Sequence, residues 1–265
     1  MIAARQIAFG KAAGKKEEPP AYWGLCFTAE EAGSTVAMTT RTLSTGGKAP
    51  NVTLETSYDG KTWEPFYVND TVVTLHDVGD RVYFRAGEAG NKRLAAIPGF
   101  SSSVPSSNYF VLTGLISASG SINSLLNGLE ETVSLNTYAF AYLFLRCSSL
   151  TTAPELPAEV FSNGCYRGLF YGCNSLRGEI YIQAGGSVAT YSCINMFTNC
   201  SSLNRIKVRF TTGLNSNANG ANTKDWLKGA ATEGTFICPT ELGTNETIQR
   251  GVYACPEGWT VINED

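Results

Sequence analysis

Three segments of the chain share one pattern, and this repeat constrains the fold more than any other feature. They read FAYLFLRCSSL from Phe140, YRGLFYGCNSL from Tyr166 and CINMFTNCSSL from Cys193. Successive repeats are 26 and 27 residues apart. A repeat of this length predicts a solenoid in which each coil packs on its neighbours. The aligned positions predicted to form its core are Phe144, Cys147, Leu150, Phe170, Cys173, Leu176, Phe197, Cys200 and Leu203.

The apolar residues within a repeat follow a helical spacing. In the first repeat they are Phe140, Leu143, Phe144 and Cys147, at positions i, i+3, i+4 and i+7. This spacing predicts one face of a short helix. A Ser-rich turn and a leucine follow, and later repeats continue into GEIYIQAG and NRIKVRFTT, which alternate as strands do. Each repeat is therefore predicted to contain a helix and a strand.

Eight cysteines raise the question of disulfides or a metal site. An even number is compatible with disulfides. The first 23 residues, however, lack the apolar run of a secretory signal, so we expect a reducing compartment. The chain has no C-x2–4-C pair and a single histidine, His76, so we expect no zinc site. The three repeat cysteines are predicted to be reduced, buried and in line as core fillers; pairing of Cys238 with Cys255 stays open.

The repeat also resembles a known family. The pattern F-x-x-C-x-S-L, at Phe144, Cys147, Ser149 and Leu150, runs into LTTAPELPA and is similar to the BspA-like (Treponema-type) leucine-rich repeats. The second repeat keeps the pattern but replaces the proline-bearing segment with RGEIYIQAG. The later pieces WLKG, GTFICP and CPEGWTV resemble the C-terminal cap of such proteins. The resemblance covers residues 110–265 and implies a capped leucine-rich-repeat solenoid.

Residues 22–97 have a different sequence pattern from the repeats. Short alternating segments separated by Gly, Asn and Asp predict an antiparallel β domain. SYDGKTW is similar to the Asp-box of sialidase propellers, S-x-D-x-G-x-T-W, but lacks one residue between Asp59 and Gly60. A single copy cannot build a propeller, so we predict a hairpin at Asp59-Gly60 with Trp63 packed on the sheet. Together with VGDRVYFRAG, these segments resemble the β domain that precedes such repeats in proteins of gut Bacteroidales and their phages.

These patterns together predict a mixed α/β fold. It consists of an N-terminal antiparallel β-sandwich-like domain, a short leucine-rich-repeat solenoid and a C-terminal cap. Ile122, Leu125, Leu126 and Leu129 keep helical spacing behind Ser121, a candidate N-cap, and predict a degenerate first coil. The expected boundaries are 1–21 for an N-terminal tail, 22–100 for the β domain, 101–120 for a linker and first strand, 121–212 for the solenoid and 213–265 for the cap.

Composition and motifs give no catalytic centre. The net charge is −3, which favours neither nucleic acid nor an anionic membrane, and the apolar runs are too short for a transmembrane helix. A Ser/His/Asp triad could form only through His76. The adjacent carboxylates Glu30-Glu31 and Glu130-Glu131 are expected to point in different directions. No phosphate-binding loop occurs. We expect a protein that is not an enzyme and has no cofactor or metal.

The first twenty residues combine scattered apolar and basic side chains. Ordering one residue costs about 1–2 kcal/mol of backbone entropy, and a segment of this composition buries little by itself. We therefore expect a partner to order it, either a sister subunit or another protein. The apolar anchors would be Ile2, Ile7 and Phe9, and the basic contacts Arg5, Lys11, Lys15 and Lys16.

Two main function classes remain. The first is a structural protein of a tailed-phage virion, as a head fibre, capsid decoration or tail appendage. It would be assembled in the host cytoplasm, anchored at the virion surface by its N-terminus, and probe a host glycan or protein. It would bind other virion proteins and form a homo-oligomer, with a trimer favoured, and neither bind nucleic acid nor insert into a membrane. The second is a bacterial surface adhesin, which needs an export signal; an accessory module of a carbohydrate-active enzyme is a further alternative.

Overall fold

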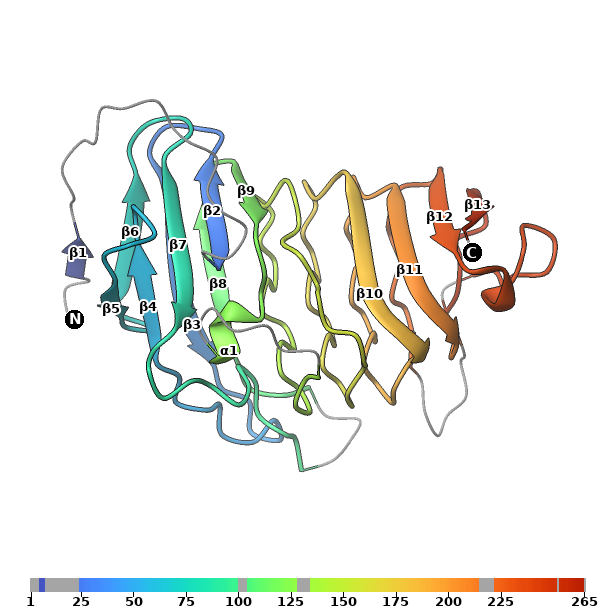
Figure 1. Ribbon diagram of the computed structural model, residues 1–265, viewed down its shortest axis with the longest axis horizontal. Coiled ribbons are helices and arrows are strands. Elements are labelled where there is room, and N and C mark those ends of the chain that lie inside the picture. The colour runs from blue at the N-terminus through green and yellow to red at the C-terminus, as the bar shows by residue number, and fades with distance from the viewer. Residues whose placement is uncertain are drawn as a thin grey trace.

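A computed structural model describes residues 5–7, 24–99, 104–127, 134–214, 222–251 and 253–264. The chain is mostly β, with antiparallel sheets at the N-terminal end and a parallel solenoid of about three turns at the other (Figure 1). Helix in the described residues is limited to α1 (Ser124–Asn127) and the 3-10 turn η2 (Thr240–Leu242). None of the described helices has the length and apolarity needed to cross a membrane.

Two sheets form the N-terminal end, and the prediction of antiparallel, sandwich-like sheets is confirmed. Buried residues alternate along their strands, as at Val36 and Met38, so that one face of each sheet is buried. The first sheet has the order β1 (Arg5–Ile7), β6 (Thr71–Leu75), β3 (Ser34–Arg41) and β8 (Ser107–Thr113), with β1 parallel to β6. The second has the order β5 (Glu64–Phe66), β4 (Leu54–Ser57), β7 (Arg81–Ala86), β2 (Leu25–Ala29) and β9 (Ile116–Ser119).

The segment SYDGKTW forms the predicted hairpin between β4 and β5. Asp59 Oδ1 accepts hydrogen bonds from the backbone N–H groups of Lys61 at 2.8 Å and Thr62 at 2.7 Å. The Thr62 contact above all lowers the pKa of the Asp59 carboxyl to about 2. The guanidinium of Arg85 lies 4.1 Å from the ring centroid of Trp63 and holds this ring against the sheet.

The solenoid contains one parallel sheet, and its two predicted strands are confirmed. GEIYIQAG lies in β10 (Glu179–Ser187) and NRIKVRFTT in β11 (Arg205–Thr212), which pair in parallel. β12 (Gly234–Cys238) and β13 (Trp259–Asn263) continue the same sheet in the same direction. The strands therefore extend into the part of the chain that was expected to act as a cap.

The repeats contain turns where helices were predicted, so the mixed α/β assignment is wrong. Residues 138–147, 164–173, 191–200 and 222–229 are almost entirely turns; we call these four segments the turn layer. In the second segment the N–H groups of even-numbered residues donate to the next coil, and those of odd-numbered residues donate three residues back. Phe170 N, for example, donates to Met196 O, and Leu169 N donates to Tyr166 O. An α-helix would direct every such bond within the segment.

The turn layer needs a left-handed backbone at every fourth residue. In the second segment these positions are Gly164, Gly168 and Gly172, with φ of 64°, 58° and 78°. A Cβ atom on Gly168 would lie 2.3 Å from the ring of Tyr142 in the preceding coil. Packing against Tyr142 therefore requires glycine at position 168, whereas the left-handed backbone alone also accepts Tyr142 and Asn195 at the aligned positions. A period of four places apolar residues at nearly the same spacing as a helix, which explains the wrong prediction.

Both sheets of the sandwich continue into the solenoid, one into the turn layer and the other into the layer that contains the parallel sheet. Phe110 N on β8 donates to Leu143 O in the turn layer, at 2.8 Å. On the other side, Ile116 on β9 forms a parallel bridge with Leu150, and Leu156 forms one with Ile182 on β10. Buried residues from both halves belong to one apolar cluster. The sandwich therefore covers the first coil of the solenoid and seals its core.

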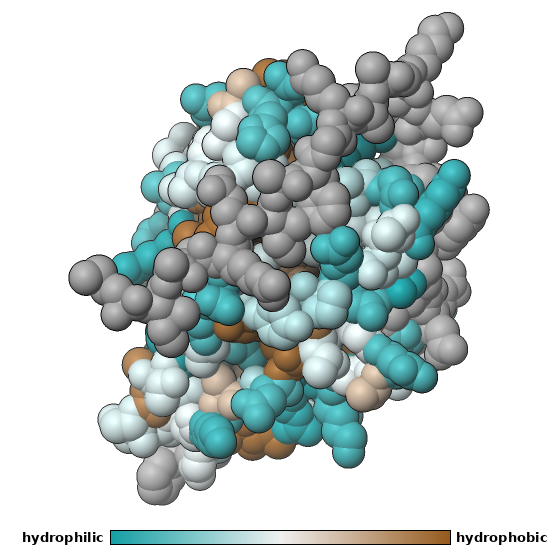
Figure 2. Space-filling model, turned by 90° about the vertical axis from the view of Figure 1, so that its left-hand side faces the viewer, coloured by the Kyte–Doolittle hydropathy of each residue, from teal (hydrophilic) through white to brown (hydrophobic). Residues whose placement is uncertain are grey.

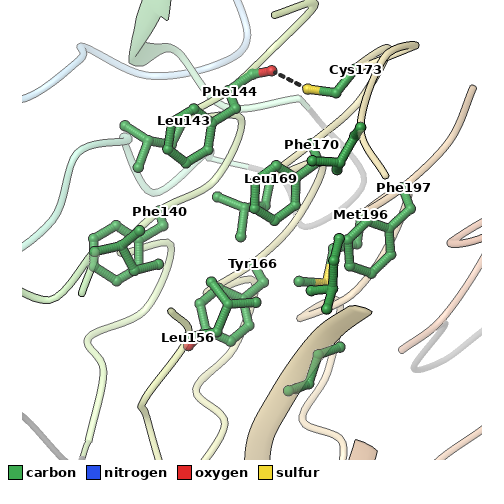
Figure 3. Close-up of a cluster of buried hydrophobic side chains, with 14 of the residues drawn as sticks. Phe140, Leu143, Phe144, Leu156, Tyr166, Leu169, Phe170, Cys173, Met196 and Phe197 are labelled. Atoms are coloured by element: carbon green, nitrogen blue, oxygen red, sulfur yellow. Dashed lines mark hydrogen bonds between the residues drawn. The ribbon is translucent and has the colours of Figure 1, made fainter. Parts of the chain in front are cut away.

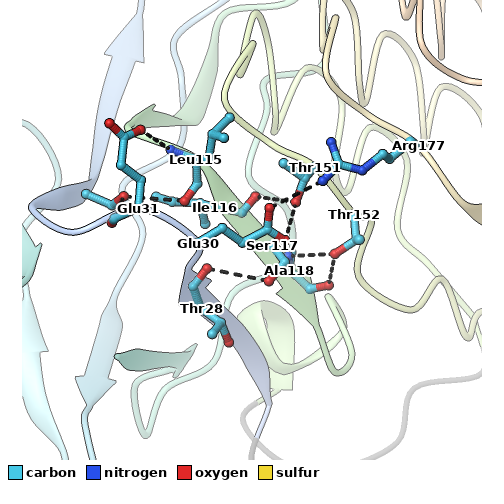
Figure 4. A network of polar contacts seen from close by, with 11 residues as sticks. Thr28, Glu30, Glu31, Leu115, Ile116, Ser117, Ala118, Thr151, Thr152 and Arg177 are labelled. Carbon is cyan, nitrogen blue, oxygen red and sulfur yellow. Dashed lines mark hydrogen bonds and ion pairs between the residues drawn. The ribbon is translucent and has the colours of Figure 1, made fainter. Parts of the chain in front are cut away.

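Polar contacts also join the two halves, at the turn after β2 (Figure 4). Glu30 accepts a hydrogen bond from Thr151 Oγ1 at 2.9 Å and faces Arg177 at 3.5 Å. Glu31 instead accepts from the backbone N–H of Leu115 at 3.2 Å. The two adjacent carboxylates thus have separate partners, and Glu30 links the sandwich to two successive coils.

We expect Gly168→Ala to destabilise the protein more than Gly178→Ala. Both glycines have positive φ, at 58° and 82°, but no atom lies within 4 Å of a Cβ at Gly178. Backbone strain costs each variant about 1–2 kcal/mol. The clash with Tyr142 adds about 1–3 kcal/mol to Gly168→Ala. Urea unfolding monitored by circular dichroism measures both losses. Equal losses would contradict the close packing of Gly168 on Tyr142.

The Asp59 hairpin should contribute pH-dependent stability. A carboxyl whose pKa is lowered on folding stabilises the folded state above its unfolded pKa of about 4, and this gain disappears as the pH falls toward 2. Asp59→Asn should therefore lower stability at pH 7, by roughly 1 kcal/mol after solvent screening of this exposed group, and the difference should vanish near pH 2. Thermal melts from pH 2 to 7 test this, with Asp77→Asn as the control. A difference that does not depend on pH would refute it.

Candidate functional site

The nine predicted repeat-core residues all lie in the interior, each at most 2% exposed. The phenylalanines among them form a column (Figure 3), and Phe110 on β8 extends this column into the sandwich. Phe110 stacks on Phe144 with ring centroids 5.6 Å apart, Phe144 on Phe170 at 5.2 Å, and Phe170 on Phe197 at 5.6 Å. Trp226 continues the column at 6.3 Å in a tilted arrangement. These residues build the scaffold and present no reactive group to solvent.

The repeat cysteines form a second column of free thiols. Each thiol lies near a phenylalanine carbonyl of the preceding element, at Sγ–O distances of 3.2 Å for Cys147, 3.1 Å for Cys173 and 3.0 Å for Cys200. Burial raises the pKa of all three thiols, to about 12 for Cys200. A thiol of this kind is neutral and unreactive at physiological pH.

The predicted anchoring residues fall mostly outside the described part of the chain. Ile2, Phe9, Lys11, Lys15 and Lys16 all lie outside it. Arg5 and Ile7 belong to β1, whose backbone pairs in parallel with β6 at the edge of the first sheet. The segment thus has one described contact with the sandwich.

A groove of about 630 Å³ is the best candidate for a binding site. It lies where the first sandwich sheet meets the turn layer. One wall is formed by the end of β3 and the middle of β8, and the other by side chains of three successive coils. Its polar lining consists of Arg41, Tyr109, Tyr142, Arg146, Tyr171 and Asn195, and its apolar lining of Val104, Phe110, Val111, Leu112 and Leu145.

The local structure explains why these side chains meet. On β3 and β8 the alternation that buries Met38 and Phe110 turns Arg41 and Tyr109 toward the outer face. In the turn layer, Tyr142, Arg146 and Asn195 occupy left-handed positions, with φ of 60°, 58° and 55°. On this outer side Tyr142 belongs to a small apolar cluster that is separate from the main core.

Arg41 is held in place but incompletely hydrogen-bonded. Its guanidinium carbon lies 4.7 Å from the ring centroid of Tyr142, in a cation–π arrangement. The same ring also packs on Gly168 and belongs to the small apolar cluster, so the ring is fixed. Arg41 Nη2 donates to Pro105 O at a long 3.4 Å, and its buried Nε has no hydrogen-bond partner. Burial, together with the charge of Arg146, lowers the pKa of Arg41 from its ordinary value, while Tyr142 and Tyr109 oppose the shift.

The groove carries positive charge without a local counter-charge. Arg41 and Arg146 line it, and no acidic residue is among the lining residues that the structure describes. Across the described chain, no group of three or more His, Cys, Asp or Glu residues is arranged to hold a metal ion. His76, the single histidine, is exposed just after β6. The arrangement is suited to binding a small anionic ligand.

Sequence reasoning missed this groove because its residues come from separate elements. Arg41 and Tyr109 are far from the repeats along the chain, and only the pairing of β8 with the first coil brings them to Tyr142. A partial signal was present in the repeat itself. Tyr142, Gly168 and Asn195 align with one another, and their variable side chains mark an outward position.

Comparison with protein-family models, with curated proteins and with solved structures gave no match to this chain.

The repeat thiols should resist alkylation in the folded protein. Iodoacetamide at pH 8 should leave Cys147, Cys173 and Cys200 unmodified, because they are buried and neutral. After unfolding in guanidinium without reductant, all three should react. Mass spectrometry of peptides from both samples gives the result. A disulfide at any of the three, or rapid modification before unfolding, would overturn their role as core fillers.

Proposed function

We propose that this protein is a non-enzymatic surface protein of a tailed-phage virion, as a head fibre, capsid decoration or tail appendage. Its N-terminal segment and sandwich attach it to the particle, and its solenoid faces outward to recognise the host. The single core that runs from the sandwich through the coils is the observation that carries this proposal. Such a core makes a rigid rod with two different ends, which suits attachment at one end and display along the other.

Two further observations support this orientation. At the sandwich end, β1 (Arg5–Ile7) pairs with β6 at the edge of the first sheet, so these three residues contact the sandwich. Figure 2 views this end of the molecule and shows hydrophobic residues among hydrophilic ones on its surface. A mixed surface of this kind is compatible with contacts between protein subunits, whose apolar share is close to that of protein surfaces in general. The motif resemblance of the repeats and the β segments to proteins of gut Bacteroidales and their phages favours the same role.

In this proposal the groove takes part in host recognition and not in attachment to the particle. It lies on the side of the rod, formed by the sandwich edge and the first three coils, and not at the sandwich end. Attachment through β1 and the adjacent end would therefore leave it accessible. Homo-oligomers, with a trimer favoured, and contacts to capsid or tail proteins are part of the same proposal.

Deletion of residues 2–18 tests the attachment. We expect the shortened chain to fold and keep its oligomeric state, measured by light scattering, but to be lost from purified particles. The control replaces the same residues with a Gly/Ser linker of equal length, which should be lost as well. Normal incorporation of either variant would mean that this segment is not the anchor. Immunogold labelling of intact particles tests the location, and purified virions that carry no label would overturn the virion role.

A further inference from the structure

We propose that the groove between β3, β8 and the turn layer binds an acidic saccharide, a sugar unit that carries a carboxylate. This inference rests on the proposed function, because it names the class of host ligand that the displayed surface recognises. The groove volume of about 630 Å³ falls within the roughly 300–1,000 Å³ that small-molecule sites occupy.

The charge of the groove selects an anion. Arg41 and Arg146 both line the groove, and the pKa of Arg41 is lowered by its burial and, to a lesser extent, by the positive charge of Arg146. The described lining offers no carboxylate to offset them. A ligand carboxylate between the two guanidinium groups would relieve this repulsion and form charge-assisted hydrogen bonds.

Arg41 is oriented for this role before a ligand arrives. Tyr142 holds one face of its guanidinium at 4.7 Å, and Gly168 closes the space behind the Tyr142 ring. The single hydrogen bond from Nη2, to Pro105 O, is long at 3.4 Å. The guanidinium is therefore fixed in position with hydrogen-bonding capacity left over. Tyr142 is a positioning residue, because its ring supports Arg41 and is itself only 4% exposed.

The remaining lining favours a sugar over a bare anion. Tyr109 and Tyr171 are half-buried, so part of each ring is accessible in the groove. Tyrosine rings present an apolar face and a hydroxyl, which match the C–H face and the hydroxyl groups of a pyranose. Asn195 adds an amide that can both donate and accept. A free inorganic anion would use the arginines and leave these groups without a role.

Glucuronate and glucose form a matched pair of probes, since they differ by the carboxylate. Titration of the full chain by isothermal calorimetry should show at least about tenfold tighter binding of glucuronate than of glucose, given the strength of charge-assisted hydrogen bonds. Acetate, which has the carboxylate without the ring, should also bind at least about tenfold more weakly than glucuronate. If glucose binds as tightly as glucuronate, the groove does not select an anion. If acetate binds as tightly as glucuronate, the groove does not recognise the sugar ring.

Two variants locate the binding. Arg146 is exposed, so Arg146→Gln should fold normally and weaken glucuronate binding by at least about tenfold. Arg209→Gln is the matched control, since Arg209 is also exposed but lies on β11 in the opposite layer. The affinity of this variant for glucuronate should equal that of the parent protein. Loss of binding in both variants, or in neither, would overturn the assignment to the groove. Immunogold labelling of particles is a separate measurement. If the protein binds glucuronate but virions carry no label, only the virion role is refuted. If virions are labelled but the protein does not bind glucuronate, only this inference is refuted.

Discussion

Hydrogen bonds between successive segments of the turn layer set the geometry of the whole molecule. In the first three segments of this layer, every second N–H donates to the next coil, as Phe144 does to Leu169 and Phe170 to Met196. This fixes the distance between coils at the spacing of neighbouring strands. The same spacing brings the phenylalanine rings to 5.2–5.6 Å and the cysteine thiols within reach of the preceding carbonyls. Each stacked ring pair adds about 0.5–1.5 kcal/mol beyond simple burial.

The interior of this fold could be predicted from the sequence, whereas its local backbone could not. Aligned Phe, Cys and Leu residues identified the core, and alternation identified β10, β11 and the sandwich strands. Apolar residues at i, i+3, i+4 and i+7 fit a helix of period 3.6 and a turn layer of period four equally well over so short a segment. Gly164, Gly168 and Gly172 held the distinguishing signal. Three glycines four residues apart would weaken a helix by about 1 kcal/mol each.

The junction between the sandwich and the solenoid was beyond sequence reasoning for a different reason. Composition changes at the end of the β domain, which suggested a boundary there. The structure instead continues both layers across it, through Phe110 and Leu143 on one side and Ile116 and Leu150 on the other. These contacts join residues more than thirty positions apart, and no local pattern encodes them. The groove depends on the same junction, because it needs walls from both halves.

A shared pair of layers also determines how such a molecule can change in length over evolution. Each coil presents the next with the same ladder of backbone groups and the same column of rings, so a duplicated repeat can be inserted without disturbing either end. One added coil would lengthen the rod by about 4.8 Å, the spacing of paired strands. The groove lies beside the sandwich and uses the first three coils only. Reach and binding chemistry are therefore encoded in different parts of the chain and can evolve independently.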